Sequence, residues 1–377
     1  MVNALLEFPA HRFAHAWAAK ELLIIMPRVR LGIIGCGDMQ SAHQQIFQEL
    51  ADKVVVTATA DIDIDKARNA AQILGAEHAF ANYEDFFPYV DAVLVVTPHD
   101  LHHAMGIKSF QAGKHVLMEK PMAVSESECI DLIKASEKAD KVLMVAYPMR
   151  YQPLVVKLKE LIDSEYLGKV FHVGIFTEQL TRPPEGHWIR SAKHLGGGQF
   201  FSHGCHYIDL LLWFLGKPKT GIHIGTRLGT PWMEREGTSD AVIAFESGAL
   251  GHHFGTWGAR ATRHGYAIHV HCEEGMLEAD ITNGVLYAHH GFEGEPPKGG
   301  LAGTLSPDPN DGEVMMAIES ESKYLQGELA HFIECIENGA SPLTDGPGSL
   351  QGLRVIWRLE EAEKQGNFAD LTGLGLD

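Results

Sequence analysis

The stretch Val29-Arg-Leu-Gly-Ile-Ile-Gly-Cys-Gly-Asp-Met39 decides the fold, because an apolar strand runs directly into a glycine-rich turn. Glycines in such a turn let the main chain approach a pyrophosphate, and the free N–H groups of a following helix, here at 41–50, would face the phosphates. Gln40 occupies the place of the third glycine of the full dinucleotide fingerprint. We therefore predict a nucleotide-binding loop made by Gly35, Gly37, Asp38 and Met39.

An acidic residue, Asp61, follows the second predicted strand, Val54–Ala60. A carboxylate at that tip can accept hydrogen bonds from the hydroxyls of an adenosine ribose. It would also repel a 2′-phosphate, whereas Lys66 and Arg68 on the next helix would attract one. We predict NAD as the cofactor in preference to NADP. The structural alternative for Asp61 is an acid at a helix N-terminus.

A lysine stands at the end of the predicted strand within Gly113-Lys-His-Val-Leu-Met-Glu-Lys-Pro121. Ligands of an open parallel sheet bind outside the carboxyl ends of its strands, so Lys120 is expected to face a ligand. The alternative is a solvated surface lysine before a proline that ends the strand.

Strands and helices alternate through the first 150 residues, until Pro148 and Pro153 break the pattern. The predicted helices lie at 63–74, 101–111 and 125–138, and further strands lie at 92–97 and 142–147. This alternation predicts an α/β fold with an N-terminal Rossmann domain, a doubly wound parallel sheet, at 26–150.

The remainder of the chain, 151–377, is predicted to form a C-terminal α+β domain with a large open, mainly antiparallel sheet and helices on one face. Its predicted strands lie at 170–177, 241–245, 250–257, 267–272, 276–281 and 285–290, and its final helices at about 315–338 and 347–365. Residues 1–25 are expected to be an N-terminal extension, consistent with a translation start assigned too far upstream.

Composition limits the partners and the compartment. The 377 residues are 45% hydrophobic, enough for two domain cores, and carry 49 acidic against 31 basic side chains, a formal charge of −18. That charge disfavours nucleic acid and an anionic membrane surface. The five cysteines are dispersed, which disfavours a disulfide scaffold or a thiolate zinc site, and no run is long enough to span a bilayer. We expect a cytoplasmic protein.

A second chemical cluster is Gly196-Gly-Gly-Gln-Phe-Phe-Ser-His-Gly-Cys-His-Tyr-Ile-Asp209. A helix beginning near Ser202 would place His206 and Asp209 on one face, with the imidazole near the helix start, where it can meet a ligand. The alternative is a partly buried histidine held by a main-chain carbonyl. The pairs His102-His103, His252-His253 and His289-His290 are adjacent, so their side chains diverge, and we expect no catalytic metal.

These motifs together resemble the Gfo/Idh/MocA oxidoreductase family, typified by glucose-fructose oxidoreductase and inositol dehydrogenases, over nearly the whole chain. The matching pieces follow the family's order: the glycine loop with His43, Thr97-Pro98 with His102, Glu119-Lys120-Pro121, Arg150 with Pro153, the triple glycine with His206 and Asp209, and 328–342. The resemblance implies NAD(H) or NADP(H), a sugar or cyclitol in the cleft between two domains, and a homodimer or homotetramer formed through the C-terminal sheet.

The resemblance also implies residue roles. Lys120 would orient the substrate hydroxyl or carbonyl, and His206 would be the general acid and base, which suits the removal of a proton from an alcohol. The implied cofactor contacts include Thr97, Pro98, His102, Glu119 and Lys120. The implied substrate contacts are Arg150, Ser202 and Asp209, with His187, Trp188, Arg190 and His194 from the loop 181–198.

Two departures from the family pattern leave alternatives open. Ser202 stands where the sugar dehydrogenases commonly carry an aspartate, and Pro148 replaces an asparagine. The function we predict is hydride transfer between nicotinamide and a secondary alcohol or ketone of a sugar, sugar derivative or cyclitol. The first alternative is a glycoside hydrolase that retains its NAD and acts through transient oxidation at C3 and elimination. The second is a non-catalytic, sugar-sensing regulator.

Overall fold

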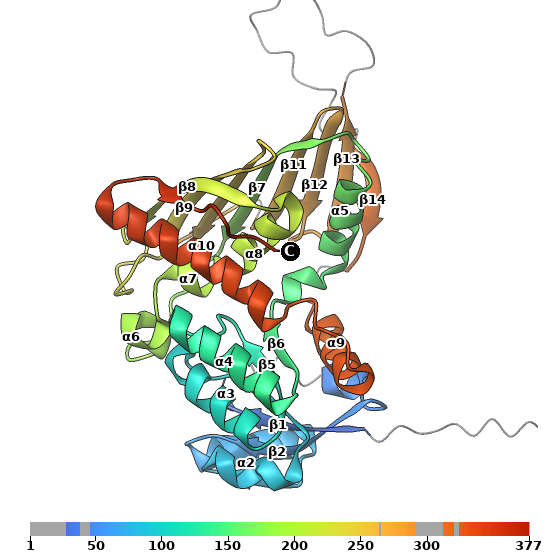
Figure 1. Ribbon diagram of the computed structural model, residues 1–377, viewed down its shortest axis with the longest axis vertical. Helices are drawn as coiled ribbons and strands as arrows, with labels where there is room; N and C mark the ends of the chain where they lie inside the picture. The colour runs from blue at the N-terminus through green and yellow to red at the C-terminus, as the bar shows by residue number, and fades with distance from the viewer. Residues whose placement is uncertain (1–27, 38–45, 264, 292–311, 320–323, 377) are drawn as a thin grey trace, which may run out of the picture.

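The computed structural model describes residues 28–37, 46–263, 265–291, 312–319 and 324–376, which form two β-sheets stacked along the long axis of the molecule (Figure 1). The first sheet has six parallel strands in the order β3-β2-β1-β4-β5-β6. This order is that of a doubly wound Rossmann sheet, so the prediction of such a sheet is confirmed. Its strands are β1 (Val29–Ile34), β2 (Val54–Ala60), β3 (His78–Phe80), β4 (Ala92–Val95), β5 (His115–Glu119) and β6 (Leu143–Ala146).

Side-chain hydrogen bonds cap the first turns of two of the helices between these strands. These helices are α2 (Ile64–Leu74), α3 (His102–Gln111) and α4 (Glu126–Ala139), with 3-10 turns at Tyr83–Tyr89, His99–Leu101 and Pro148–Arg150. The Asp63 carboxylate caps α2 by accepting from the Asp65 N–H, and Ser125 caps α4 by accepting from the Glu128 N–H. Part of the predicted helix 41–50 is seen as a helix at 46–49, while 41–45 lie outside the described residues.

A helix from the far end of the chain covers one face of this sheet. Helix α9 (Leu325–Asn338) buries Leu329, Phe332 and Ile333 in the same hydrophobic cluster as Leu31 of β1 and Leu94 of β4. The Val145 N–H of edge strand β6 donates to Thr344 O at 2.9 Å. The first domain is therefore completed by residues more than 175 positions after its last strand.

The second sheet has nine strands in the order β14-β13-β12-β11-β7-β10-β9-β8-β15, all antiparallel neighbours except the parallel pair β7 and β10. Its strands are β7 (Val170–Glu178), β8 (Pro218–Thr226), β9 (Thr238–Phe245), β10 (Leu250–Thr256), β11 (Tyr266–Cys272), β12 (Gly275–Asp280), β13 (Val285–His290), β14 (Glu313–Ala317) and β15 (Ala369–Asp370). The prediction of a large, mainly antiparallel second sheet is confirmed.

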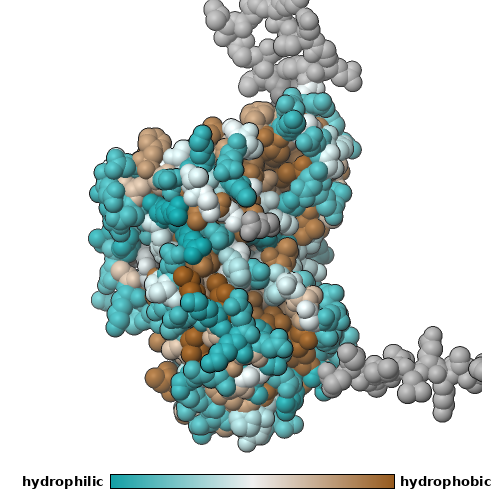
Figure 2. Space-filling view, in the orientation of Figure 1, coloured by the Kyte–Doolittle hydropathy of each residue, from teal (hydrophilic) through white to brown (hydrophobic). Residues whose placement is uncertain are grey.

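Helices α5 (Pro153–Asp163), α8 (Cys205–Leu215) and α10 (Gly346–Gln365) lie on one face of the second sheet, as Figure 1 shows. The short helices α6 (Ala192–Leu195) and α7 (Gln199–Ser202) and a 3-10 turn at Trp188–Arg190 connect this layer to the first domain. On the face drawn in Figure 2, hydrophilic residues cover most of both domains and hydrophobic residues gather between them.

Three sequence predictions of secondary structure are wrong. The helix predicted from about 315 begins at Leu325, because residues 313–317 form edge strand β14. The helix predicted to begin near Ser202 begins at Cys205, because Ser202 ends the separate helix α7. Pro153 does not break structure but occupies the first turn of α5, where its missing N–H has no partner to lose. The proposed extension 1–25 lies outside the described residues.

Candidate active site

The glycine turn after β1 is shaped by close packing on one side and open space on the other. Gly35 has φ +98°, and a Cβ there would lie 2.1 Å from Val96 O, so only glycine fits. Among the described residues, a Cβ at Gly37 would meet nothing within 4 Å. This opening beside main-chain N–H groups fits the pyrophosphate of a dinucleotide. Asp38 and Met39, which the sequence also assigns to this loop, lie outside the described residues.

Asp61 stands at the tip of β2 and holds the turn. Its Oδ2 accepts from the Cys36 N–H at 2.8 Å and its Oδ1 accepts from the Asp63 N–H at 2.9 Å. The carboxylate is thus fixed beside the glycine turn rather than capping α2, which Asp63 does. Its position suits ribose hydroxyls, since a carboxylate can accept further hydrogen bonds.

His102 ties together the segments that follow β4 and β5. Its Nε2 lies 3.0 Å from Thr97 O and its Nδ1 lies 2.9 Å from Pro121 O, and the ring is fully buried. Burial lowers the pKa of His102. Both ring nitrogens therefore face main-chain oxygens, one of them that of Pro121, the residue after Lys120. Thr97 and Pro98 are at the same edge, Pro98 preceding the 3-10 turn His99–Leu101, and the Glu119 carboxylate accepts from the Lys120 N–H.

Lys120 reaches from the first domain to the second. Its Nζ donates to the main-chain oxygen of Ser202 at 3.1 Å, a contact between residues 82 positions apart. Through this bond the ammonium group lies at the end of α7, directly before the turn that leads to His206. The serine offers its carbonyl rather than a carboxylate, so the ammonium charge has a neutral partner at this point.

His206 is in the first turn of α8, almost completely buried. Its ring packs edge-on against Tyr147, with centroids 5.6 Å apart, and against His203 at 6.0 Å. Gly204 permits the turn between α7 and α8, because a Cβ there would lie 2.4 Å from Phe200 O. The sequence therefore brings His206 and Ser202 to the domain junction through two short helices instead of one.

Arg150 and Asp209, both assigned to substrate by the sequence, are paired with each other. The guanidinium donates to the two carboxylate oxygens at 2.6 and 2.7 Å, and both side chains are buried. Such a bidentate pair satisfies both charges. It anchors α8 to the 3-10 turn after β6, and the carboxylate is already neutralised by Arg150.

The loop 181–198 contacts the first domain through residues that the sequence named. Trp188 meets the buried His99 ring edge-on at 4.9 Å, and His194 Nδ1 lies 2.8 Å from Asp100 Oδ2. Arg190 donates to Pro183 O at 2.9 Å, while His187 Nδ1 accepts from the Ile189 N–H. The indole therefore lies near the lysine edge, whereas Arg190 and His187 stabilise the loop itself.

Sequence reasoning missed His99 and His203. Burial, and next the charge of Lys120, lower the pKa of His99 well below its ordinary value, and its Nδ1 lies 2.8 Å from Leu195 O. His203 lies between the Gln199 amide at 3.4 Å and the Tyr266 hydroxyl at 3.3 Å, and that hydroxyl donates to Gln179. His99 directly follows the Thr97-Pro98 motif and His203 lies within the quoted stretch 196–209, and these positions were the available signal.

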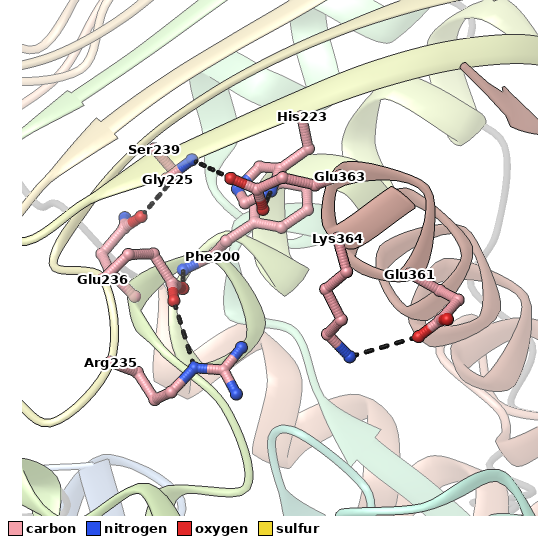
Figure 3. A network of polar contacts seen from close by, with 10 residues as sticks. Phe200, His223, Gly225, Arg235, Glu236, Ser239, Glu361, Glu363 and Lys364 are labelled. Carbon is pink, nitrogen blue, oxygen red and sulfur yellow. Dashed lines mark hydrogen bonds and ion pairs between the residues drawn. The ribbon is translucent and has the colours of Figure 1, made fainter. Parts of the chain in front are cut away.

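Glu236 supports the triple-glycine turn from behind (Figure 3). Its Oε1 accepts from the Phe200 N–H at 3.4 Å, its Oε2 lies 3.7 Å from Arg235, and a Cβ on Gly198 would lie 1.8 Å from Oε1. Burial raises the pKa of Glu236. In the same region Glu363 accepts from the Gly225 N–H and contacts His223, each at 2.8 Å. Gly198, the last residue of the triple glycine, therefore has no room for a side chain next to the Glu236 carboxylate.

Two absences within the described residues bear on other functions. In that part of the chain, no group of three or more histidine, cysteine or acidic side chains is arranged to hold a metal ion. None of the helices described is both long and apolar enough to cross a bilayer.

Two family models match the chain in succession. The model of the oxidoreductase family with an NAD-binding Rossmann fold matches residues 29–147, and the GFO/IDH/MocA C-terminal domain model matches residues 155–278. Among curated relatives, a scyllo-inositol 2-dehydrogenase (NAD(+)) from Bacillus subtilis is 27% identical over 87% of this chain and 92% of its own. A myo-inositol 2-dehydrogenase from Thermotoga maritima is 29% identical over 59% of this chain and 67% of its own.

Solved structures share the fold. A levoglucosan dehydrogenase in complex with NADH and levoglucosan superposes with a TM-score of 0.80 over 92% of this chain and 100% of its own, at 18% identity. An aldose-aldose oxidoreductase from Caulobacter crescentus gives a TM-score of 0.76 over 92% of this chain and 100% of its own, at 23% identity. Since both domain models match in order and the glycine turn leads to the expected sheet, the chain belongs to the GFO/IDH/MocA family of NAD(P)-dependent oxidoreductases.

Proposed function

We propose that the protein is an NAD-dependent dehydrogenase or reductase of a secondary alcohol or ketone in a sugar, sugar derivative or cyclitol. The observation that carries the proposal is the hydrogen bond from Lys120 Nζ to Ser202 O, which brings an amine of the nucleotide-binding half to the turn before His206. Relatives named as inositol dehydrogenases support the substrate class.

The proposed chemistry divides between the two side chains. A bound nicotinamide supplies the hydride acceptor or donor. In oxidation His206 takes the hydroxyl proton, and in reduction it returns that proton to the carbonyl oxygen. The Lys120 ammonium stabilises the negative charge that develops on the same oxygen, and it can leave its bond to Ser202 O to do so. Trp188 offers an apolar face to a pyranose or cyclitol ring.

NAD preference follows from Asp61. Its carboxylate is held beside the glycine turn by the Cys36 N–H, where a 2′-phosphate would meet a negative charge. The variant Asp61→Ser is expected to bind NADH more weakly. The ratio of the NADPH dissociation constant to the NADH dissociation constant should fall at least tenfold, measured by titration of cofactor fluorescence. Wild-type activity with NADPH alone would refute this assignment.

The function is tested by following NADH formation across a panel of inositols, aldoses, anhydrosugars and their ketones. Stoichiometric NADH from a free polyol, lost in His206→Ala while NADH binding persists, is the expected result. Absence of hydride transfer with the whole panel in both directions would refute the proposal.

A glycoside hydrolase that retains NAD is the second candidate, favoured by the serine at position 202. Because a serine replaces the aspartate common at this position, the site differs from the family's usual sugar dehydrogenases. Aryl glycosides separate the two: release of the aglycone without net NADH supports the hydrolase. A sugar-sensing regulator would bind cofactor and sugar without turnover, which the retention of both Lys120 and His206 opposes.

The proposal also covers the compartment, the oligomeric state and the domain boundary of the enzyme. We expect a cytoplasmic homodimer or homotetramer with a domain boundary near residue 150, acting on small molecules. Sedimentation of the purified protein tests the assembly.

A further inference from the structure

A cavity of about 500 Å³ lies at the junction of the two domains. Its walls are the turn after β6, helix α8, the segment 342–351 and the chain end at 375–376. Helices α8 and α10 lie side by side at this place (Figure 1). Neither Lys120 nor His206 is among the described residues that line the cavity, so it is separate from the candidate active site. Its size suits a small organic molecule, since ligand pockets commonly have roughly 300–1,000 Å³.

The charged side chains in the wall are already engaged within the protein. Arg150 and Asp209 form their bidentate pair at 2.6 and 2.7 Å. The Asp345 carboxylate accepts from the Gly348 N–H at 2.8 Å and so caps the start of α10. A charged ligand would have to break one of these contacts or stay without a partner, which is costly away from water. The wall therefore favours a neutral ligand.

Two polar atoms of the wall, Ser349 Oγ and Gln351 Oε1, have no hydrogen-bond partner among the described residues. Ser349 is only 2% exposed, and Gln351 is half-buried. A buried polar atom without a partner costs free energy. The amide oxygen can only accept a hydrogen bond, whereas the serine hydroxyl can donate or accept. Hydroxyl groups of a ligand satisfy both atoms.

Apolar groups complete the wall of the cavity. They are the indole of Trp213 on α8 and the side chains of Pro342, Leu343 and Pro347. Such carbon surfaces suit the C–H groups of a ring or chain whose oxygens reach the two unpaired polar atoms. Hydroxyl groups on a compact carbon skeleton without charge are the chemistry of a sugar or polyol.

Water alone accounts poorly for this space. One or two water molecules would satisfy the two polar atoms, but each takes up only roughly 30 Å³. We propose that the cavity is a second binding site, which takes a neutral polyhydroxylated molecule outside the catalytic cleft. The proposal does not rest on the proposed function, because hydride transfer there is assigned to Lys120 and His206, and neither lines this cavity.

A molecule in this cavity would touch both domains. Arg150 belongs to the turn that ends the first domain, while Asp209 lies on α8, less than one helical turn after His206. The wall also draws on segments about two hundred residues apart in the sequence, which only the folded chain brings together. Binding therefore favours the folded state by mass action, and the melting temperature should rise with ligand concentration.

Isothermal titration calorimetry of the full chain tests the proposal. The neutral probes are myo-inositol, D-glucose and xylitol, and the charged probes are D-glucosamine and D-glucuronate. At least one neutral probe should bind more tightly than both charged probes. The double variant Ser349→Ala/Gln351→Ala should raise its dissociation constant at least tenfold, because two hydrogen bonds are lost. Gln365→Ala, an exposed glutamine of the same helix, is the matched control and should bind as wild type.

Two further measurements locate the bound probe. The variant His206→Ala, altered in the catalytic cleft, should keep the wild-type dissociation constant of this site. Hydrogen–deuterium exchange of the unaltered chain should be slowed by the probe in 342–351 more than in 97–121, which needs no variant. Circular dichroism checks that each variant is folded.

Several outcomes would overturn the proposal. They are the absence of binding by every neutral probe at about 10 mM, a preference for a charged probe, and protection of 97–121 alone. A loss of affinity in His206→Ala but not in Ser349→Ala/Gln351→Ala would likewise assign the binding to the catalytic cleft. None of these measurements follows hydride transfer, so failure of the proposed function leaves their results readable.

Discussion

Lys120 Nζ donates to Ser202 O at 3.1 Å, so an ammonium group of the first domain is held by the main chain of the second. His102 joins the segments that follow β4 and β5 by contacting Thr97 O and Pro121 O, and Pro121 is the residue next to the lysine. The position of the amine is therefore set by a main-chain contact, and its hydrogen-bond partner there is an uncharged carbonyl oxygen.

Replacing Lys120 with alanine should reduce turnover about 100-fold or more with little change in NADH affinity, because the charge acts mainly on the transition state. Steady-state kinetics and cofactor fluorescence measure the two effects. Lys108→Ala, which removes an exposed ion pair with Glu84, should leave both unchanged. Equal losses of turnover and cofactor binding in Lys120→Ala would contradict the assigned role.

The two glycines of the nucleotide turn should respond differently to alanine. Gly35→Ala places a Cβ 2.1 Å from Val96 O at φ +98°, and we expect a loss of several kcal/mol of stability. Gly37→Ala meets open space, so its melting temperature should stay close to wild type while NADH binding weakens at least tenfold. Thermal melts with and without NADH distinguish them. Wild-type NADH affinity in Gly37→Ala would place the pyrophosphate elsewhere.

Asp209→Asn should destabilise the protein by about 3–5 kcal/mol, because it leaves the buried Arg150 guanidinium without its opposite charge. The double variant Arg150→Met/Asp209→Leu removes both charges and should recover most of that loss. Urea unfolding measures both. A single variant as stable as wild type would show that the pair adds no net stability.

The raised pKa of Glu360 predicts that the stability of the fold changes with pH near neutrality. Burial, and then the charge of Glu236, raise its pKa from 4.5 to about 7. The folded protein therefore holds a proton that the unfolded chain has released, so this stabilisation is full below pH 4.5 and is lost as pH rises through about 7.

In wild type, the free energy of unfolding should fall by on the order of 2–3 kcal/mol between pH 5 and 8 as Glu360 loses its proton. The variant Glu360→Gln should lack this fall, so its melting temperature should decrease less over the same pH range. The exposed Glu361 on the same helix is the control, since Glu361→Gln should leave the slope unchanged. The same slope in Glu360→Gln as in wild type would refute the assignment.

Five strands of the first sheet could be predicted because they are short apolar runs bounded by turn residues, whereas the edge strand β3, with the sequence His-Ala-Phe, has no such pattern. The second sheet was harder. Strand β8 buries Gly221 and His223 against the helix layer, where an apolar pattern would place aliphatic residues, and so it gave no signal. Helix α5 was not predicted because Pro153 was interpreted as a break in the pattern. Proline is also common at the first position of a helix, which is where Pro153 lies.

Some site residues could likewise be predicted from the sequence, and others could not. Gly35, Asp61 and Lys120 stand at strand ends, and a parallel sheet dictates that such ends meet at one edge. The pairing of Arg150 with Asp209 spans 59 residues, and the roles of His102 and Glu236 depend on main-chain atoms. Contacts of this kind depend on tertiary geometry, which has no local signature.

The cover that Thr344 and helix α9 provide for the first sheet has a consequence for synthesis. Strand β6 leaves the ribosome nearly two hundred residues before Thr344 does, so the nascent nucleotide-binding half carries an open sheet edge and a bare apolar face in the meantime. The native packing of the first domain is therefore incomplete until that segment has been made, and an unpaired strand edge of this kind favours aggregation in the meantime.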